Sequence, residues 1–381
     1  MMMSATRICM RLDNTFTSDL RVRREAEALA EAGYDITVVA DMKPGLGLAE
    51  RETVNGVKIR RIAKTSRVPY WSIVKPLLEE AADIYHAHDI DSLFPCLAAA
   101  RLGKKRARVV YDTHELWSGH AKDKIRTKRR MLIKVEGTML RASDALITAS
   151  PAYAEQILAR YKYKGPSVTV LNVPVFRTDE ELAPYWAKRG EDGLVRVTAI
   201  SVFQHGRGAI PLIQALAYLP ENFVVELVGP IPQPEYERMM REAAAPFGDR
   251  ARIVGPIPPN DIVPRLASAD VSAVLIEPLS LSYRLTAPNK LFDSMMAGTA
   301  IAASDMRFIG QTVRAENVGE VCEVSDPADI ARAVLAAYEN AAEYGANGRA
   351  AALRYNWENE RAKLIDLYAT LAPTAKETTA C

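Results

Sequence analysis

A repeated alternation between short apolar runs and amphipathic segments constrains the fold most strongly. An apolar run at 7–12 is followed by a helical pattern at 19–32, and the run ITVVA follows at 36–40. Short β-branched runs that alternate with helices of period 3.6 are typical of βαβ units and parallel sheets. After residue 190 the alternation resumes, with runs at 194–202, 223–229, 251–255 and 271–277. We therefore predict an α/β fold with two doubly wound, Rossmann-like domains.

The length of the chain agrees with two domains. A chain of 381 residues is too long for one ordinary core and suits two domains of between about 150 and 200 residues. Prolines interrupt the periodicity between the two halves, which is typical of a linker. The predicted segments are a first domain at 1–175, a linker at 176–190, a second domain at 191–355, a last amphipathic helix at 356–372 and a tail at 373–381. Neither domain carries a GxGxxG fingerprint, which disfavours a nicotinamide enzyme.

Compartment and redox chemistry follow from composition. The sequence has no 18-residue apolar run and its opening lacks an apolar signal segment, so we expect a cytoplasmic protein. The four cysteines, Cys9, Cys96, Cys322 and Cys381, show no CxxC spacing, which argues against a disulfide framework and a cysteine zinc site. We expect the first three to be buried as small apolar residues.

The charge is distributed unevenly along the chain. Residues 1–175 contain 29 Lys and Arg against 20 Asp and Glu, whereas the remainder contains 20 against 27. Much of the positive excess lies in 101–134, with 12 basic and 3 acidic residues. This basic segment could contact an anionic membrane or an anionic acceptor, and a solvated helix face is an equal alternative. Nucleic acid is disfavoured because no interleaved aromatic residues accompany the charges.

The stretch TAPNKLFDSMMAGTAIAAS at 286–304 predicts a helix followed by a buried strand. Pro288 suits the first turn of the helix and Gly298 suits its C-terminal cap. Lys290 would stand in the first turn, where a cation at the positive end of the helix dipole is mildly unfavourable. A bound phosphate would reverse that sign, because it would meet both the ammonium and the free backbone N–H groups.

Two polar residues accompany Lys290 on the same short helix. Asn289 and Asp293 are four residues apart, so they lie on one face. A carboxylate one turn into the helix could accept two hydroxyl groups of a sugar attached to the phosphate. The alternative is a capped amphipathic helix with a solvated Lys–Asp pair. A second phosphate element is the loop Gly206-Arg207-Gly208, which lies between a predicted strand and helix; alone it is a weak signal.

Polar residues also follow two predicted strands of the first domain. His86, His88 and Asp89 end the run at 82–89, and His114 and Glu115 end the run at 108–115. Open α/β sheets bind ligands at the carboxyl ends of their strands, so these side chains should share a crevice. Satisfied structural histidines are the alternative. The HAHD run also resembles a zinc site, but no third, helix-borne ligand is evident, and we predict no metal.

Three stretches resemble one family. PNKLFDSMMAGTAIAAS resembles the PNKLFEYMxAGxPVVAS signature of family-4-like glycosyltransferases of the GT-B fold (glycosyl transferases group 1). SDLRVRREAEALAEAGYDITVVA resembles the opening DxRVxREAxxLxxxGxxVxVV of the same family, and ASDALITASPAY resembles a third family pattern. The resemblance implies two domains that face each other across a cleft, with a C-terminal helix that crosses back to the first domain.

The resemblance also implies roles for the residues above. Asp293, in place of the signature's Glu, would hold the ribose of a nucleotide-diphosphate sugar, and Gly255 would lie near its base. Arg207 and Lys290, with Gly206, Gly208 and Asn289 beside them, would hold the diphosphate. In the first domain, our own candidate for contacting the acceptor or the donor sugar is His114, and the acceptor-side candidates are His88, Asp89 and Glu115. Thr286 stands where many members have another Glu.

The predicted function is transfer of a sugar from a nucleotide-diphosphate donor to the hydroxyl of a glycan or lipid-linked acceptor. By resemblance the reaction would retain the anomeric configuration and need neither metal nor cofactor. A lipid-linked acceptor would place the enzyme at the inner face of the plasma membrane. Two alternatives remain open: a catalytically silent GT-B subunit that binds a nucleotide sugar or a partner transferase, and a GT-B nucleotide-sugar epimerase.

Overall fold

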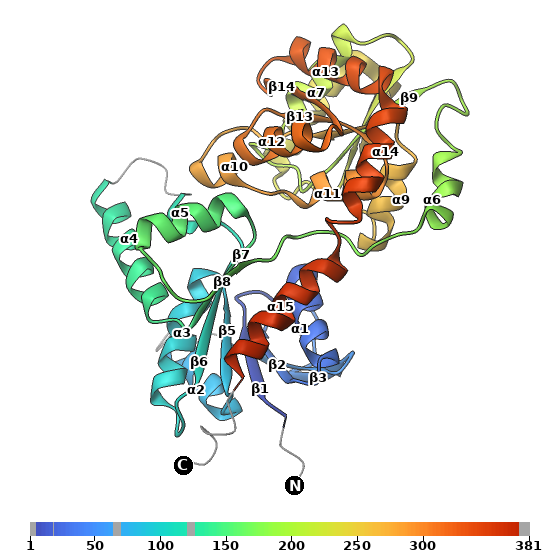
Figure 1. Cartoon of the computed structure of the whole chain (residues 1–381). Coiled ribbons are helices and arrows are strands. Elements are labelled where there is room, and N and C mark those ends of the chain that lie inside the picture. Colours follow the sequence, from blue (N-terminus) through green and yellow to red (C-terminus); the bar gives the residue numbers. More distant parts are fainter. Residues whose placement is uncertain (1–4, 18, 64–69, 120–125, 373–381) are drawn as a thin grey trace. The chain divides into compact units, whose positions relative to one another are not determined.

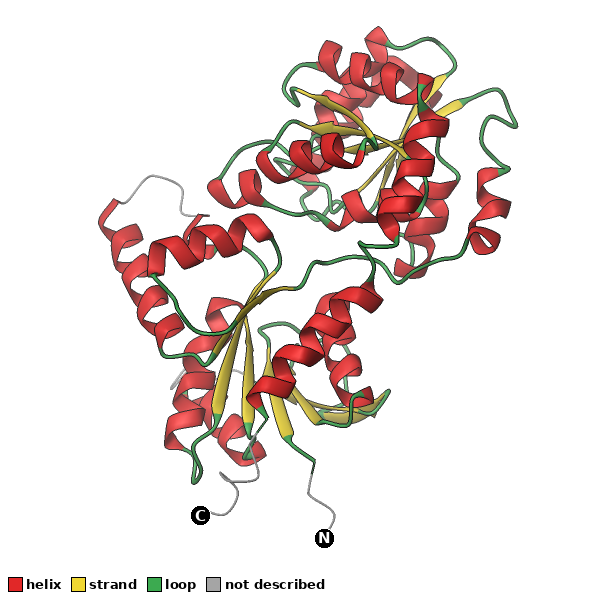
Figure 2. Ribbon diagram, in the orientation of Figure 1, coloured by secondary structure: helices red, strands yellow, loops and turns green. Residues whose placement is uncertain are grey.

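A computed structural model describes residues 5–17, 19–63, 70–119 and 126–372 of the chain (Figure 1). The chain divides into two compact units. Unit 1 comprises Met1–Val170 together with Glu360–Cys381, and unit 2 comprises Leu171–Asn359. Each unit contains a wholly or mostly parallel sheet flanked by helices on both faces, so the predicted fold class of two Rossmann-like domains is confirmed (Figure 2).

Unit 1 is built on an eight-stranded sheet in the order β3-β4-β2-β1-β5-β6-β7-β8. Its strands are β1 (Arg7–Arg11), β2 (Asp35–Asp41), β3 (Arg51–Val54), β4 (Val57–Ile62), β5 (Ile84–His88), β6 (Arg108–Thr113), β7 (Ala145–Thr148) and β8 (Ser167–Thr169). All pairs are parallel except β3 with β4. That hairpin turns at Asn55 and Gly56, which both have positive φ, as an Asn-Gly hairpin turn requires.

The helices of unit 1 cover both faces of this sheet. They are α1 (Leu20–Glu31), α2 (Trp71–Glu80), α3 (Asp89–Leu102), α4 (Arg126–Arg141), α5 (Pro151–Tyr161) and, from the far end of the chain, the part of α15 (Trp357–Leu371) from Glu360 onward, with a 3-10 turn at Trp117–Gly119. Asp19 caps α1 by accepting a hydrogen bond from the Val22 backbone N–H. On α15, Tyr368 is fully buried and Arg361 pairs with Glu31 of α1.

Unit 2 is built on a six-stranded sheet in the order β11-β10-β9-β12-β13-β14, with every pair parallel. Its strands are β9 (Val195–Ile200), β10 (Phe223–Val228), β11 (Ala251–Val254), β12 (Val271–Val274), β13 (Ala300–Ser304) and β14 (Gly319–Cys322). β10, β12 and β13 are buried along their whole length. Burial on both faces explains why these strands are mostly apolar, apart from residues such as Glu226 and Ser272, and do not alternate between apolar and polar residues.

The helices of unit 2 flank its six-stranded sheet (Figure 2). They are α6 (Asp179–Trp186), α7 (Ala209–Ala215), α8 (Pro234–Ala244), α9 (Ile262–Ala267), α10 (Leu281–Leu285), α11 (Asn289–Met296), α12 (Arg307–Glu316), α13 (Pro327–Glu339) and α14 (Ala341–Ala352), with 3-10 turns at Leu216–Tyr218, Ala245–Arg250 and Pro259–Asp261. α6 lies inside the segment predicted as a linker. A capping box between Thr178 and Glu181 begins it.

Each sheet has one point where the strand order changes direction. In unit 1 the chain proceeds outward from β1 to β2 and then returns to β5, and in unit 2 it proceeds from β9 to β10 and returns to β12. Ligands of open α/β sheets bind beyond the carboxyl ends of strands at such points. Among the described residues, no helix combines the length and the apolarity needed to cross a bilayer. Cys9, Cys96 and Cys322 are buried and unpaired, as predicted, while Cys381 lies outside the described residues.

Candidate functional site

Two loops of unit 2 meet at the carboxyl ends of β9 and β12. Gly206 and Gly208 have φ of +89° and +65°. A Cβ on Gly208 would lie 2.5 Å from the Leu275 Cβ, so both the conformation and the close approach require glycine. Glu277 joins the loops, because its backbone N–H donates to Gly206 O at 3.0 Å and its carboxylate accepts from the Gly208 N–H at 3.3 Å.

These contacts hold Arg207 in a defined position. Its guanidinium lies over the ring of Tyr283, 4.9 Å from the centroid, and its buried Nε has no hydrogen-bond partner in the described part of the chain. Gln204 holds the hydroxyl end of the same ring, because its Nε2 donates to the Tyr283 hydroxyl at 3.4 Å. A guanidinium stacked on an aromatic ring is fixed in orientation while its charge stays available to an anion.

Lys290 lies in the first turn of α11, beside Arg207. Its Nζ donates to the backbone carbonyl of Leu275 at 3.4 Å. Burial, and then the charge of Arg207, lower the pKa of Lys290 to about 7. The helix is fastened to the sheet by Ser294, whose hydroxyl is 2.6 Å from that of Ser272 on β12. Two cations therefore converge on a helix start, an arrangement that a phosphate would relieve.

The other predicted residues of unit 2 have varied positions. Asn289 is exposed at the start of α11, and Asp293 is partly buried one turn later. Gly255 lies in the exposed loop after β11, which is two strands away from β9. Thr286 is the C-cap of α10. Glu277 was missed, although a carboxylate directly after a buried strand run was a signal of the same kind as His86–Asp89.

A second polar cluster lies in unit 1, around the buried carboxylate of Asp112 on β6. Arg21 of α1 forms two parallel hydrogen bonds to it, Nη2 to Oδ1 at 2.9 Å and Nε to Oδ2 at 3.2 Å. Arg21 also donates to Val170 O at 2.7 Å and lies 3.1 Å from the carboxylate of Glu25. Burial raises the pKa of Glu25 to about 8, despite the charge of Arg21.

Three histidines surround the same carboxylate. The Asp112 Oδ2 is 3.7 Å from His86 Nε2, 3.4 Å from His88 Nδ1 and 3.3 Å from His114 Nε2. The rings of His86 and His88 are stacked, with centroids 4.1 Å apart, as expected for alternate residues of one strand. Burial opposes ionisation of Asp112, but the charges of Arg21 and His114 hold its pKa well below the usual value.

His114 is the member of this cluster that reaches the surface, with 19% of its side chain exposed. Its Nδ1 lies 3.4 Å from the carboxylate of Asp89, and its backbone N–H donates to Asp89 at 2.9 Å. Asp89 holds this position with φ of +58°. Burial would lower the pKa of His114, but Asp89 and Asp112 raise it to about 9, so the ring is an imidazolium at neutral pH. Glu115 is exposed in the same loop.

This shift predicts a pH dependence of stability. The folded pKa of His114 lies above its unfolded value of about 6.5. Its contribution is therefore fully present below about pH 6.5 and is lost as pH rises through about 9. Urea unfolding of the wild type and of His114→Gln should be measured across this pH range. The free energy of unfolding should decline less with rising pH in the variant than in the wild type. Parallel declines in the two proteins would contradict the assignment.

The cluster also bears on the prediction that the protein binds no metal. Glu25, His86, His88 and Asp112 offer ligand atoms within 4.8 Å of one another, and Glu25 is the helix-borne ligand that we had not found in the sequence. However, the guanidinium of Arg21 bonds Asp112 and contacts Glu25, and its charge opposes a dication at the same place. The absence of a metal therefore stays a prediction.

Sequence reasoning missed the residues that hold this cluster together. Arg21 and Glu25 belong to the motif DxRVxREA, but that motif was used only for its resemblance to the family and no role was predicted for either residue. Their four-residue spacing beside an apolar stripe was the available signal. Tyr368 of α15, whose hydroxyl lies 2.7 Å from His86 Nδ1, had no local signal because it is 282 residues away.

Comparison with known proteins agrees with this architecture. The family model described as Glycosyltransferase Family 4 matches residues 20–175, and that of Glycosyl transferases group 1 matches residues 196–340. Glycogen synthase of Mycobacterium tuberculosis is 23% identical over an alignment 397 positions long, gaps included, which covers 91% of this chain and 89% of that protein.

Two solved structures share the fold over nearly the whole chain. Sucrose-phosphate synthase of Thermosynechococcus elongatus has a TM-score of 0.77 at 20% identity. The match covers 96% of this chain and 99% of the synthase chain. Anabaena Alr3699/HepE, solved in complex with UDP-glucose, has a TM-score of 0.75 at 14% identity, with 96% and 99% covered. The two family matches and the shared fold agree with the motifs in the sequence. The chain therefore belongs to the family-4-like glycosyltransferases, or glycosyl transferases group 1, and is a transferase with the GT-B fold.

Proposed function

We propose that this glycosyltransferase takes a nucleotide-diphosphate sugar in unit 2 and transfers the sugar to an acceptor hydroxyl. The observation that carries the proposal is the pair Arg207 and Lys290, two cations held together at the start of α11. A diphosphate fits this place because it neutralises both charges and meets free backbone N–H groups. The UDP-glucose complex of the similar Alr3699/HepE supports the assignment.

The chemical role of these cations follows from where charge develops. When the bond between the sugar and the diphosphate breaks, negative charge grows on the leaving diphosphate. Arg207 and Lys290 are already oriented, by Tyr283 and by the Leu275 carbonyl respectively, so they stabilise that charge without rearranging. Asp293 would accept the ribose hydroxyls. Retention of the anomeric configuration is part of the proposal by family resemblance.

In unit 1 the proposal gives His114 a contact with a sugar oxygen. As an imidazolium held by Asp89 and Asp112, it donates hydrogen bonds and does not act as a base at neutral pH. The acceptor would be a glycan or a lipid-linked glycan. The basic segment 101–134 supports peripheral attachment to an anionic membrane, with salt-sensitive retention on vesicles as its expected sign. Residues 120–125 of that segment lie outside the described residues.

Product analysis tests the proposed reaction. The purified protein would first be screened against nucleotide sugars for a rise in Tm, since a ligand that binds the folded state stabilises it. The sugar that stabilises most would then be incubated with glycan and lipid-linked acceptors. A glycosylated acceptor supports the proposal. An isomerised free nucleotide sugar would identify an epimerase, and binding without any product would identify a silent subunit.

Asp293→Ala should weaken nucleotide binding by about 2 to 4 kcal/mol, because a charged acceptor of ribose hydroxyls is lost. Isothermal titration calorimetry with the nucleoside diphosphate measures the change. Asp249→Ala, at an exposed carboxylate of the same unit, serves as the matched control and should bind normally. Full nucleotide affinity in folded Asp293→Ala protein would remove Asp293 from the donor site.

Activity should survive treatment with EDTA, because side-chain cations and a helix start would stabilise the negative charge on the diphosphate. In other enzymes a divalent metal ion has this role. Metal analysis of the purified protein should find no stoichiometric zinc or other ion at the cluster of Glu25, His86, His88 and Asp112. Loss of activity with EDTA that returns on adding one metal would overturn this expectation. A bound ion that disappears in His88→Ala would place it in this cluster.

A further inference from the structure

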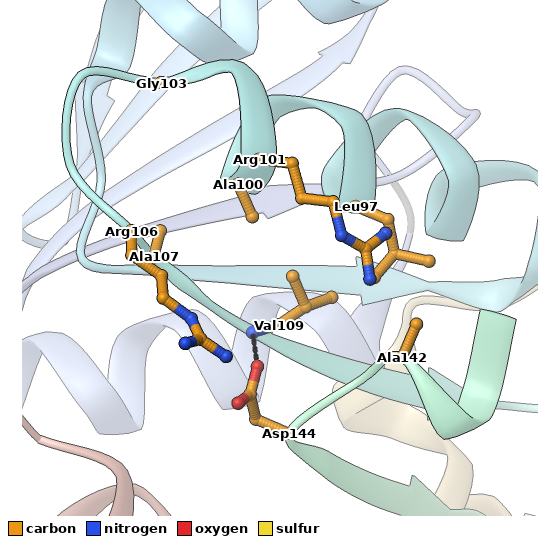
Figure 3. Close-up of a pocket in the computed structure, with 9 residues that line it drawn as sticks. All are labelled: Leu97, Ala100, Arg101, Gly103, Arg106, Ala107, Val109, Ala142 and Asp144. Atoms are coloured by element: carbon orange, nitrogen blue, oxygen red, sulfur yellow. Dashed lines mark hydrogen bonds between the residues drawn. The ribbon is translucent and has the colours of Figure 1, made fainter.

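A pocket of about 360 Å³ lies at the amino-terminal ends of the strands in the sheet of unit 1 (Figure 3). It is formed where α3 ends, where β6 begins and where the chain turns from α4 into β7. The histidine cluster lies at the carboxyl ends of β5 and β6, so this pocket is at the opposite ends of the strands of the same sheet. Its volume is within the range of small-ligand sites, about 300 to 1,000 Å³.

Two arginines give the pocket its charge. Arg101, from the last turn of α3, and Arg106, from the approach to β6, both line it and are exposed. Figure 3 shows their guanidinium groups on either side of Val109 in that view. Neither has a hydrogen bond or ion pair with any residue that the structure describes. Their neighbour Lys105, in contrast, pairs with Asp83.

The rest of the pocket wall is apolar apart from one carboxylate. Leu97, Ala100 and Val109 contribute apolar surface. Asp144 accepts a hydrogen bond from the Val109 N–H at 2.8 Å through Oδ2, and its own N–H donates to Val109 O at 2.7 Å. These two bonds fix the carboxylate against the strand. Within the described chain, its second oxygen, Oδ1, has no partner.

We infer that this pocket binds a hydroxylated phosphate, that is, a phosphate group carried on a polyol. Two guanidinium groups that have no partner among the described residues match a phosphate, which they can bind through several parallel N–H···O bonds. Asp144 would repel a bare anion, but its free oxygen accepts a hydrogen bond from a hydroxyl on the carrier. A soluble sugar or glycerol phosphate has this chemistry, and so has a glycerophosphate lipid headgroup. The site does not depend on the donor site proposed for unit 2.

The test uses glycerol 3-phosphate as the soluble probe and vesicles of phosphatidylglycerol or phosphatidylcholine as the membrane probes. Binding is measured by calorimetry and by co-sedimentation for the full chain, for Arg101→Gln, for Arg106→Gln and for the double variant. Lys104→Gln is the matched control, because Lys104 is exposed in the same loop but does not line the pocket. Circular dichroism and Tm verify that every variant is folded. Saturating UDP is added in a parallel series to block binding in unit 2.

Each arginine substitution should weaken binding about tenfold or more, whereas Lys104→Gln should leave it nearly unchanged. Loss of glycerol 3-phosphate binding in this pattern identifies a soluble ligand. The same pattern with phosphatidylglycerol vesicles alone identifies a headgroup. Equal weakening by Lys104→Gln would show diffuse attraction to surface charge and overturn the pocket. Displacement of the probe by UDP, or no binding to either probe, would also overturn it.

Discussion

Asp112→Ala is expected to lower the free energy of unfolding by about 3 to 5 kcal/mol, because it breaks a buried ion pair from one side. Arg21 is only 6% exposed and forms its bidentate bonds to this carboxylate. Without Asp112, the guanidinium would keep Val170 O and Glu25 as its partners among the described residues, and three histidines would lose their common neighbour. Urea unfolding followed by circular dichroism measures the effect.

A matched control comes from the surface of the same sheet. Asp35 pairs with Lys58 at 2.6 Å, but that lysine is 57% exposed. Asp35→Ala should therefore cost no more than about 1 kcal/mol. The paired replacement Arg21→Met with Asp112→Leu should be much less damaging than the sum of the single changes, because neither member of the ion pair is left buried without the other. If Asp112→Ala costs as little as Asp35→Ala, the cluster is not a buried ion pair in solution.

Lys290→Met is expected to lower kcat/KM about 10²- to 10³-fold, as loss of one preorganised charge at a developing anion does. Methionine keeps much of the apolar stem, so α11 should keep its packing against β12. Steady-state kinetics with the donor identified by the screen give the number. Arg241→Met is the matched control, because Arg241 is 63% exposed and pairs with Glu237 on the surface of α8. A Lys290→Met enzyme with normal kcat/KM would remove Lys290 from the reaction.

The lowered pKa of Lys290 allows a second test, the uptake of a proton on nucleotide binding. A lysine with a purely structural role would not change this uptake. With a pKa of about 7, the amine is largely neutral at pH 8 in the free protein. A bound diphosphate stabilises the charged form, so nucleotide binding at that pH should take up a proton. Calorimetry in buffers of different ionisation enthalpy detects this uptake. The uptake should disappear in Lys290→Met and persist in Arg241→Met.

The parts of the fold that local pattern determines could be predicted from the sequence. The helix and strand of 286–304 begin and end close to the expected residues, with Gly298 at φ +62° after the helix. The hairpin of β3 and β4 was not predicted, although Asn55-Gly56 is a known hairpin signal. α6 was not predicted, because the two prolines of this segment were interpreted as a break in periodicity. The capping pattern of Thr178 and Glu181 would have indicated the start of a helix.

The candidate site shows the same division between local and tertiary information. Arg207 and Lys290 could be assigned because glycines and a helix start mark their positions in the sequence. Asp89 was predicted to lie near His114, but the bidentate pair of Arg21 with Asp112 was not, since α1 and β6 are elements that only the fold brings together. Glu277 is an intermediate case, because its place after a strand was visible but its bond to the Gly208 N–H depends on the meeting of two loops.

The origin of α15 at the far end of the chain has a consequence for how the protein is made. Unit 1 needs Tyr368 for His86 and for the edge-to-face contact with Tyr34, at 6.0 Å between ring centroids. A ribosome synthesises those residues after the whole of unit 2. The second unit can therefore complete its core during translation, whereas the first must wait with a buried face still open until the last helix emerges. Nascent chains stalled before residue 357 should expose that face to chaperones, even though every strand of both sheets has already been synthesised.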